Sequence, residues 1–587
     1  MRERLLTRHF QQRFLDNDLI SPHADRHETL AVAGAALVTS GLFVSVLLSM
    51  KYLFRPFQSP GWTAVVALDD RLLLITWSMV VMALVAVATW DALALDSRDT
   101  EILGPLPIPR FVVIKAKVRA VVIFAAGFAF ALNLAPSVLH PLLMVAKLPI
   151  GLLATIWLIG VHAGMTLFAG ASGFLVVLAI RELLSVFVRG SWFRRVSLGV
   201  QAVLVVGSAA SVFLAPALSS RVGQWLASGT PNPFWFPPVW FLGLYEMLAG
   251  STIFRLSRNG LPPQVMRSED QFTNAYESLR MLFHQLGVVA IVVITAVAVV
   301  AVVAYAWNSR QLPVRTATRR TTRHRLRDRL VGIATRFIVR HPVAQAGFFF
   351  TLQCLVRSTP HRLATATSAA VGIAVATVSL RGVNLRDPIG ATSSVAFLAL
   401  QTVFIVALVV GFRHAIRVPA DLRASLTFHL AWSGRERQYL SGVKRAALIA
   451  LILPTVLTLF PLHLLLLGWQ RALAHLVFGV LFGSLLLELL LLGFRKLPFA
   501  SAYVPGGSLK SMISIYALAL LALVYGVASI EQFALSDTSG MVIAVAVLAM
   551  ALFCVAAVDS RRRREATTPT ESDEFPDSET QRLDLAG

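Results

Sequence analysis

The sequence predicts an all-α, polytopic integral membrane protein with about twelve transmembrane helices, arranged as two halves of six. Three observations support this fold class. The chain of 587 residues is 56% hydrophobic and only 14% charged, and its mean hydropathy is +0.70. Several apolar runs exceed the roughly 20 residues that are needed to cross a bilayer core. The basic residues behind the net charge of +22 gather in alternate connections, as expected when Lys and Arg mark the cytoplasmic side.

The first half begins with a polar segment, residues 1–28, which we expect to be a cytoplasmic amphipathic helix at the membrane surface. Leu6, Phe10 and Phe14 recur there at helical spacing among arginines. The first transmembrane half covers residues 29–307. Its predicted spans lie near Thr29–Met50, near Leu72–Trp90, in a stretch ending near Leu134, and near Ile150–Ile180, Ser197–Leu218 and Leu286–Trp307.

Two connections in this half are long. Segment 91–119 joins the second and third predicted spans. Residues 219–285 form an aromatic, proline-broken insertion before the sixth predicted span. We expect this insertion to be extracellular and to contain interfacial or re-entrant helix.

A basic linker at residues 308–345 leads to the second transmembrane half, residues 346–559. The predicted spans of this half lie near Ala364–Leu380, Ser393–Phe412, Arg445–Leu467, Ala472–Gly493, Met512–Ile530 and Met541–Val558. Residues 413–445 form a basic cytoplasmic connection, and the tail 560–587 has a disordered composition. The alternation of basic connections predicts a multi-pass protein of the plasma membrane (the inner membrane of a bacterial cell) with both termini in the cytoplasm.

The two halves look related. Asp421–Arg445 has the place in the second half that segment 91–119 has in the first. Both stretches begin with Asp and end in a basic cluster followed by Ala, KVRA at 117–120 and VKRA at 443–446. Parallel duplication is a common transporter design.

Segment 91–119 is the main candidate for a functional surface. It places acids first, an apolar turn with prolines next and basic residues last. Acids suit the first turns of a short helix, and proline stops that helix. Such a surface at the ends of two membrane helices can be pushed by another protein, although an ordinary cytoplasmic loop is the simpler alternative. The residues predicted to make this contact are Asp96, Arg98, Asp99, Glu101, Leu103, Leu106 and Pro107.

The run Leu95–Lys117, LDSRDTEILGPLPIPRFVVIKAK, resembles the coupling-helix region of ABC-2 type exporter permeases. Those permeases are similar in having an acid, a Thr-Glu-x-Leu-like turn, a Pro-Ile step and a Lys at the start of the third span. The resemblance implies a transport subunit that separate cytoplasmic ABC ATPase subunits drive, with docking at Asp96–Leu106. ATP and magnesium would then be bound by the partner, and this chain would hold no cofactor.

The chain departs from the family pattern in two respects. Family subunits commonly have six spans and pair, whereas this chain contains both predicted halves. Its second half also lacks the Leu-Pro-Ile step. Contact of the second half with an ATPase therefore stays open, as does homo-oligomerisation. The residues of the second coupling segment would be Asp421, Arg423, Arg435 and Arg437.

Independent motifs agree with a non-enzymatic subunit. The sequence has no GxxxxGK[ST] loop to hold phosphates. Glu488, in LLLELLLL, is either an intramembrane functional acid or a paired structural acid. His162, His463 and His475 lie one per predicted span, which favours core or interfacial histidines over a metal site. The basic linker suits membrane lipids rather than nucleic acid.

Three alternatives remain. A secondary, ion-coupled transporter of the major facilitator type also has six plus six spans, but its Gly-x-x-x-Asp-Arg-x-Gly-Arg pattern is missing here. A membrane-embedded glycosyltransferase could use Asp69–Asp70 as base and metal ligands. Because the predicted second span starts directly after Arg71, capping of a helix N-terminus is the simpler role for these acids. A non-transporting partner protein is the third alternative.

Overall fold

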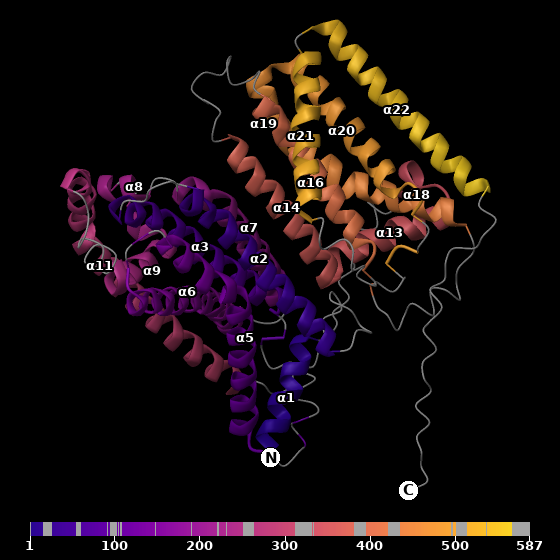
Figure 1. Cartoon of the computed structure of the whole chain (residues 1–587). Coiled ribbons are helices and arrows are strands. Elements are labelled where there is room, and N and C mark those ends of the chain that lie inside the picture. Colours follow the sequence, from indigo (N-terminus) through magenta and orange to yellow (C-terminus); the bar gives the residue numbers. More distant parts are fainter. Residues whose placement is uncertain are drawn as a thin grey trace. The chain divides into compact units, whose positions relative to one another are not determined.

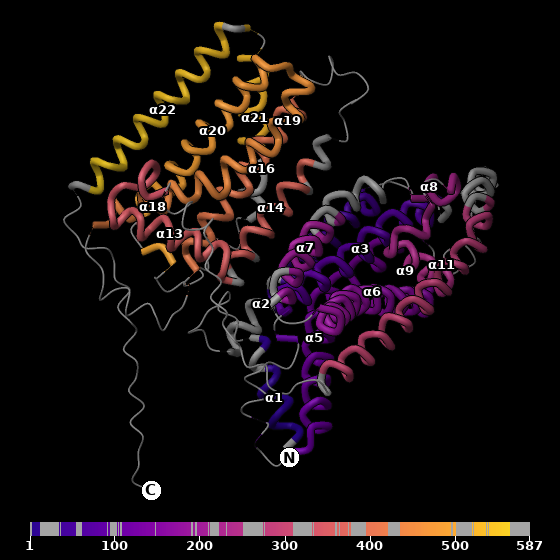
Figure 2. The backbone as a smooth tube through the Cα atoms, turned by 180° about the vertical axis from the view of Figure 1, so that it is seen from behind, coloured from indigo at the N-terminus to yellow at the C-terminus, as the bar shows by residue number. Residues whose placement is uncertain are grey.

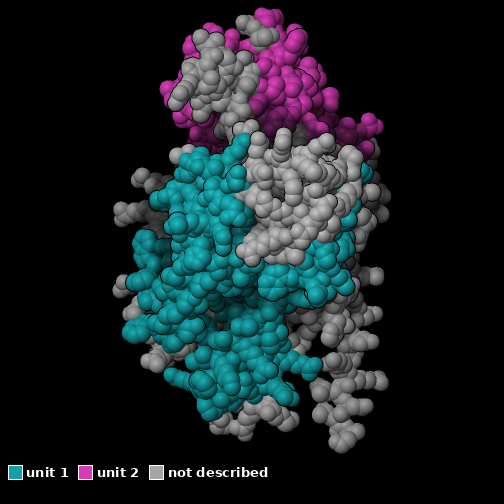
Figure 3. Space-filling view, turned by 60° about the vertical axis from the view of Figure 1, so that its left-hand side comes forward, with its two compact units in different colours: residues 1–317 teal, residues 318–587 magenta. Residues whose placement is uncertain are grey.

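The computed structural model shows two compact units, Met1–Ala317 and Thr318–Gly587 (Figure 3). The boundary between the units falls inside the predicted basic linker, and every described element is a helix. The structure describes residues 2–15, 26–54, 60–90, 92–93, 103, 105, 108–146, 148, 150–188, 191–219, 222–229, 232–250, 263–310, 332, 334–380, 395–418, 420, 435–494, 497–499, 513–535 and 537–565.

Unit 1 is a helical bundle in which α3 packs against α6, α7 and α9 (Figure 1). Its buried core joins Leu68 and Leu72 of α3 to Phe241 of α9 and Leu286 of α11. The unit consists of α1 (Arg2–Leu15), α2 (Arg26–Phe54), α3 (Pro60–Ala88), α5 (Arg110–Val145), α6 (Leu152–Phe187), α7 (Ser191–Ser219), α8 (Val222–Ser228), η1 (Pro233–Trp235), α9 (Pro237–Tyr245), η2 (Glu246–Gly250) and α11 (Pro263–Arg310).

Unit 2 is built around α16, which packs against α14, α20 and α21 (Figure 2). In the same unit α18 crosses α13 so closely that a Cβ atom at Gly442 would lie 2.0 Å from the backbone oxygen of Ala344. Only glycine fits at such a crossing. The unit consists of η3 (Ala334–Ile338), α13 (Pro342–Arg357), α14 (Thr359–Leu380), α16 (Val395–Ala415), α18 (Glu436–Ala447), η4 (Leu448–Ile452), α19 (Leu453–Leu467), α20 (Trp469–Leu491), α21 (Ile513–Leu535) and α22 (Thr538–Glu565).

The long apolar helices make the chain a multi-pass membrane protein. Within the described residues, nine helices are long and apolar enough to span a bilayer: Leu37–Phe54, Trp62–Ala88, Arg110–Val145, Leu152–Phe187, Tyr276–Asn308, Val395–Ala415, Glu436–Leu467, Trp469–Leu491 and Ser539–Arg563. Shorter apolar helices occur at the other three predicted spans, Val196–Ser208, Ala364–Ile373 and Ala522–Leu535. The count of twelve spans, six in each half, stays a prediction.

The start of the second span differs from the prediction. The helix α3 begins at Pro60, so Asp69, Asp70 and Arg71 lie well inside it and do not cap its N-terminus. The reason is that both residues have charged partners on other helices: Asp70 pairs with the partly exposed Lys51, and Arg71 pairs with the buried Glu246. With those partners, charged side chains are compatible with a continuous buried helix.

Two further helices are longer than predicted. The third span does not end near Leu134, because α5 continues to Val145 with Pro136 and Pro141 inside it. Proline is tolerated in membrane helices when neighbouring segments accommodate the freed backbone groups. The helix α11 begins at Pro263, so the last part of the predicted insertion 219–285 is helical and continuous with the sixth span.

Candidate functional sites

Most of the predicted coupling surface lies outside the described residues. Leu103 is described, and its side chain is half-buried. The residues outside the described ranges are Asp96, Arg98, Asp99, Glu101, Leu106 and Pro107. Because α5 begins at Arg110, the part of segment 91–119 that connects two helices is residues 91–109, which we term segment 91–109. The structure describes the helices on either side, α3 and α5, and specific contacts hold both of them.

The chain that leaves α3 is fixed to the end of α6. Arg181 Nε donates a hydrogen bond of 2.8 Å to the backbone oxygen of Trp90, and Trp90 and Leu93 are buried. Arg181 also forms an ion pair of 2.6 Å with Glu182. Asn308 of α11 donates to the Glu182 carboxylate at 2.7 Å. One polar cluster therefore ties α3, α6 and α11 together directly before segment 91–109.

The start of α5, directly after this segment, is held by α1. Phe10 and Phe14 of α1 are buried, and the Phe14 ring stacks on Phe124 of α5 with 4.9 Å between the ring centroids. Lys117 Nζ lies 4.8 Å from the centroid of Phe10 and 4.9 Å from that of Phe14. Cation–π contacts of this kind gain strength when they are removed from water, and Lys117 is buried.

This packing gives part of the apolar face of α1 a protein partner, and the location of α1 at the membrane surface stays a prediction. The Phe10 and Phe14 side chains pack on α5, so the part of the apolar face that these rings form is covered by protein. The opposite charges of Glu3 and of Lys115 and Arg119 add contacts of 3.3 and 3.7 Å between the same two helices. The amphipathic pattern of α1 was predicted from the sequence, and the structure adds that its two phenylalanines pack on α5, a helix of the same chain.

The second predicted coupling segment is also described only in part. Asp421 and Arg423 lie outside the described residues, whereas Arg435 and Arg437 are exposed at the start of α18. The structure does not bring these arginines into a common cluster. The neighbouring residues on α18 instead carry the polar contacts.

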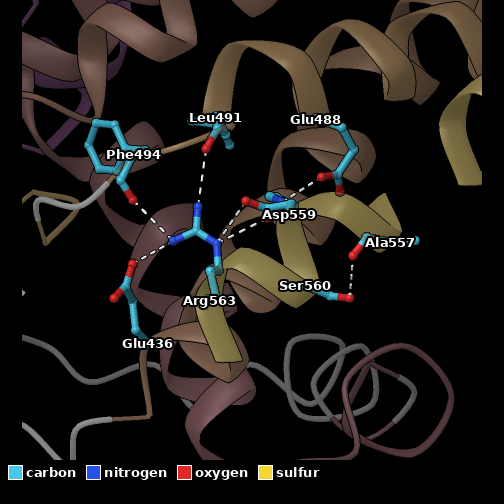
Figure 4. Close-up of polar contacts among 9 residues, drawn as sticks. Glu436, Glu488, Leu491, Phe494, Ala557, Asp559, Ser560 and Arg563 are labelled. Carbon is cyan, nitrogen blue, oxygen red and sulfur yellow. Dashed lines mark hydrogen bonds and ion pairs between the residues drawn. The ribbon is translucent and has the colours of Figure 1, made fainter. Parts of the chain in front are cut away.

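Five charged side chains link α18, α20 and α22 (Figure 4), and we term them the α18 charge cluster. Lys444 Nζ contacts Glu488 at 2.6 Å and Asp559 at 2.8 Å. Arg563 pairs with Asp559 at 3.0 Å and with Glu436, and it donates to the backbone oxygens of Leu491 and Phe494. Of the two alternatives for Glu488, the structure supports the paired acid.

A buried set of ion pairs in unit 1, the unit 1 polar network, was not predicted. Asp70 accepts from Lys51 Nζ at 2.6 Å and from the Tyr52 hydroxyl at 2.5 Å. Next to it, Arg71 pairs with Glu246 of η2 at 2.5 Å, and the Tyr276 hydroxyl donates to the same carboxylate at 2.6 Å. The Arg71 and Glu246 side chains are 1% and 0% exposed. The sequence carries no signal for a partner 175 positions away.

The same contacts argue against Asp69–Asp70 as a shared metal site. Both Asp70 oxygens are engaged by Lys51 and Tyr52, whereas Asp69 Oδ1 accepts from the backbone N–H of Val222 at 3.2 Å. Across the described ranges, no group of three or more His, Cys, Asp or Glu side chains is arranged to hold a metal ion. The glycosyltransferase alternative gains no support from this geometry.

The three histidines predicted as core or interfacial residues, His162, His463 and His475, are buried, and each lies against another histidine. His162 of α6 lies against His140 of α5 with 5.2 Å between the ring centroids. His463 of α19 lies against His475 of α20 at 4.4 Å. Spacing along one helix could not reveal these pairs because each joins two helices.

Comparison of the chain with family models, with curated proteins and with solved structures finds no match. The fold and these sites define a multi-pass, all-helical membrane protein with polar clusters inside its bundles.

Proposed function

We propose that the chain is the permease of an ABC-2 type exporter, driven by separate cytoplasmic ATPase subunits that bind ATP and magnesium. The observation that carries this proposal is that both ends of segment 91–109 are fixed to the helices of unit 1. Arg181 holds the chain at Trp90 before the segment, and α1 holds the first turns of α5 after it.

Anchoring of this kind is what a force-transmitting loop needs. A partner that pushes on a freely moving loop changes only the loop, whereas a push on a loop with fixed ends displaces the attached helices. The Arg181–Glu182–Asn308 contacts extend the attachment to α6 and α11. Packed side chains and hydrogen-bond networks carry coupling between sites in this way.

Unit 2 has a comparable attachment after its own connection. The chain enters α18 at Glu436, and the α18 charge cluster joins α18 to α20 and α22. We propose that residues 421–434 form a second contact with an ATPase subunit, and that the α18 charge cluster transmits its movement to unit 2.

The test is binding of an ABC ATPase, sought first among the reading frames that neighbour the gene of this chain. The permease and this ATPase are co-expressed and co-purified, with Leu103→Asp and Leu106→Asp as the test variants. A carboxylate in an apolar groove must lose its hydration, so each variant should release the ATPase while membrane insertion is unchanged. Phe337→Asp, an exposed apolar position in η3, is the matched control and should retain the partner. Retention by both test variants would contradict the proposal.

A specific observation favours a second candidate, a secondary, ion-coupled transporter. The structure buries the carboxylates of Asp70, Glu246 and Glu531 inside helices. Ionisable residues within membrane segments often serve ion or proton pathways. Purification from the native membrane after chemical cross-linking separates the two candidates. An exporter permease should carry a nucleotide-binding subunit, whereas an ion-coupled carrier should not.

A further inference from the structure

Each unit holds one pair of buried histidines between two helices that correspond in the predicted halves. His140 lies on α5, beyond the predicted end of the third span, and His162 lies on the fourth predicted span of the first half. His463 and His475 lie on the third and fourth predicted spans of the second half. The surroundings of the second pair point to a ligand.

The second pair is completed by an acid from a third helix. His475 Nδ1 lies 2.5 Å from Glu531 Oε1 of α21. Gln401 of α16 donates its amide to the backbone oxygen of His475 at 2.9 Å, and the Phe397 ring packs edge-on against His463. His463, His475, Glu531 and Gln401 are each at most 1% exposed. Helices α16, α19, α20 and α21 thus enclose one polar site.

Four polar atoms at this site form no hydrogen bond with any described residue: His463 Nε2, His475 Nε2, Glu531 Oε2 and Gln401 Oε1. Buried polar atoms are nearly always hydrogen-bonded, so each exception calls for an explanation. The Glu531 and Gln401 oxygens can only accept, and a neutral histidine ring has a proton on one nitrogen alone. The site therefore holds more acceptors than donors, which favours the uptake of a further proton.

The charge of the site also favours a proton. An ionised carboxylate that is buried beside a neutral ring would be an uncompensated charge, which is strongly unfavourable in a protein interior. The other charged groups on the four helices are Arg471, exposed one turn before His475 on α20, Glu488 near the far end of α20, where it pairs with Lys444, and Arg413 in the last turn of α16, twelve positions after Gln401. Asp537 lies in the turn before α22. The first turns of α22 are apolar, and α16 contributes the neutral Gln401. Among the described residues, His475 is the group that forms an ion pair with Glu531, so a proton on this pair is the charge that balances the carboxylate.

We propose that His475 and Glu531, with His463 as a second acceptor, form a proton-binding site, which we term the His475 site. The site takes one proton from solution and holds it between the His475 ring and the Glu531 carboxylate. A metal ion does not fit there, because 2.5 Å between Nδ1 and Oε1 leaves no room for an ion. The inference does not depend on the energy source of transport.

The histidine pair of unit 1 provides an internal comparison. His162 packs against the Tyr245 ring, and Arg71 lies over the same ring, 4.5 Å from its centroid. A guanidinium at this place opposes a second positive charge on the imidazoles. No described carboxylate pairs with His140 or His162. The same two-histidine arrangement is therefore expected to bind a proton in unit 2 and not in unit 1.

The test is solid-state NMR of the full chain in lipid bilayers, with ¹⁵N in the histidine rings and ¹³C in the glutamate carboxyl groups. Dipolar dephasing between the two labels selects histidines that touch a glutamate, and His475 is the described histidine in such an ion pair. Spectra between about pH 5 and pH 8 cover the range in which histidine charge changes. We expect a selected ring that carries two N–H groups, or a neutral ring beside a protonated carboxyl group. A neutral ring beside an ionised carboxylate at every pH, or the absence of dephasing, would overturn the proposal.

Variants assign the signal. His475→Gln should remove the selected resonance, and Glu531→Gln should abolish the imidazolium signal at neutral pH. His162→Gln, the matched control in unit 1, should leave the selected resonance unchanged. If Glu531→Gln does not fold, the wild-type spectrum alone decides the outcome, because it reports the proton directly.

Discussion

The two units use buried charge in different ways, although each packs a pair of histidines between two of its helices. In unit 1 the buried acids Asp70 and Glu246 face Lys51 and Arg71, which carry fixed positive charges. In unit 2 the buried acid Glu531 faces His475, a ring that has no fixed charge and with which we propose it shares one proton. One helical arrangement can therefore hold either a permanent ion pair, which fixes its helices, or a proton-binding pair, whose protonation can change.

Breaking the permanent pair of unit 1 should have the largest effect. Arg71→Met leaves the Glu246 carboxylate buried without a counter-charge, and removing one partner of a buried pair costs roughly 3–5 kcal/mol. We expect this loss in the free energy of unfolding in mixed micelles. The double variant Arg71→Met with Glu246→Gln should recover most of the loss, since no charge remains.

The exposed pair of Glu277 and Arg280 serves as the matched control for this measurement. Its side chains are 61% and 71% exposed, and exposed pairs contribute about 0–1 kcal/mol. Arg280→Met should therefore change little. An equal loss from Arg71→Met and Arg280→Met would show that the unit 1 polar network does not hold its helices together.

The corresponding change in unit 2 should have a smaller effect. Lys444→Met removes the cation between Glu488 and Asp559, but the Lys444 side chain is 14% exposed, so water and Arg563 compensate in part. We expect a loss of about 2 kcal/mol in the free energy of unfolding. Arg562→Met, an exposed neighbour of Arg563 on α22, is the control and should be close to neutral. A larger loss from Lys444→Met than from Arg71→Met would reverse the proposed ranking of the two units.

The next prediction concerns the packing of α1 on α5 in unit 1, where we expect a smaller, local effect. Phe14→Ala removes the ring that stacks on Phe124, and it should loosen α1 without unfolding the bundle. We expect amide hydrogen exchange in α1 to accelerate by about 10-fold or more, because about 1.4 kcal/mol of lost docking energy corresponds to that factor. The exposed Leu5→Ala on the same helix should leave exchange unchanged. Similar exchange in wild type and Phe14→Ala would rule out the proposed fixing of α5 by α1.

The smallest expected effect is a pH dependence in unit 2, outside its spans. Burial lowers the pKa of His361, whose Nε2 lies 3.0 Å from the backbone oxygen of Val418. The folded ring takes up a proton only at a lower pH than the unfolded ring, whose pKa is about 6.5. Stability should therefore fall as the pH drops below that value. The midpoint temperature of thermal unfolding, measured at several pH values, should fall less steeply with decreasing pH in His361→Gln than in the wild type. The same pH dependence in both proteins would show that His361 is not its source.

The sequence predicts the membrane fold well because apolar length is a local property. Nine of the predicted spans contain helices long enough to cross a bilayer, and α1 shows its amphipathic pattern in Phe10 and Phe14. The start of α3 was mispredicted because Asp70 and Arg71 read as a polar boundary. Their partners Lys51 and Glu246 make them compatible with a buried helix.

The polar sites could be predicted only in part, because their members come from distant helices. Glu488 stood out as an acid in an apolar run, but its partner Lys444 belongs to a helix that begins before the predicted ninth span. Glu531 and His475 lie 56 positions apart, and no spacing rule joins them. Lys117 was predicted only as part of a basic cluster, because nothing in the sequence places the rings of α1 around it.

The most direct test of the central claim is site-specific photo-cross-linking from position 103 in native membranes. A benzophenone amino acid replaces Leu103, and a second variant carries it at Leu153, an exposed residue in the first turn of α6 on the predicted opposite side of the membrane. The proposed function predicts a covalent adduct between position 103 and a nucleotide-binding subunit, with no such adduct from position 153. An inserted, well-expressed chain that forms no adduct from position 103, or that forms the adduct from position 153 instead, would contradict it.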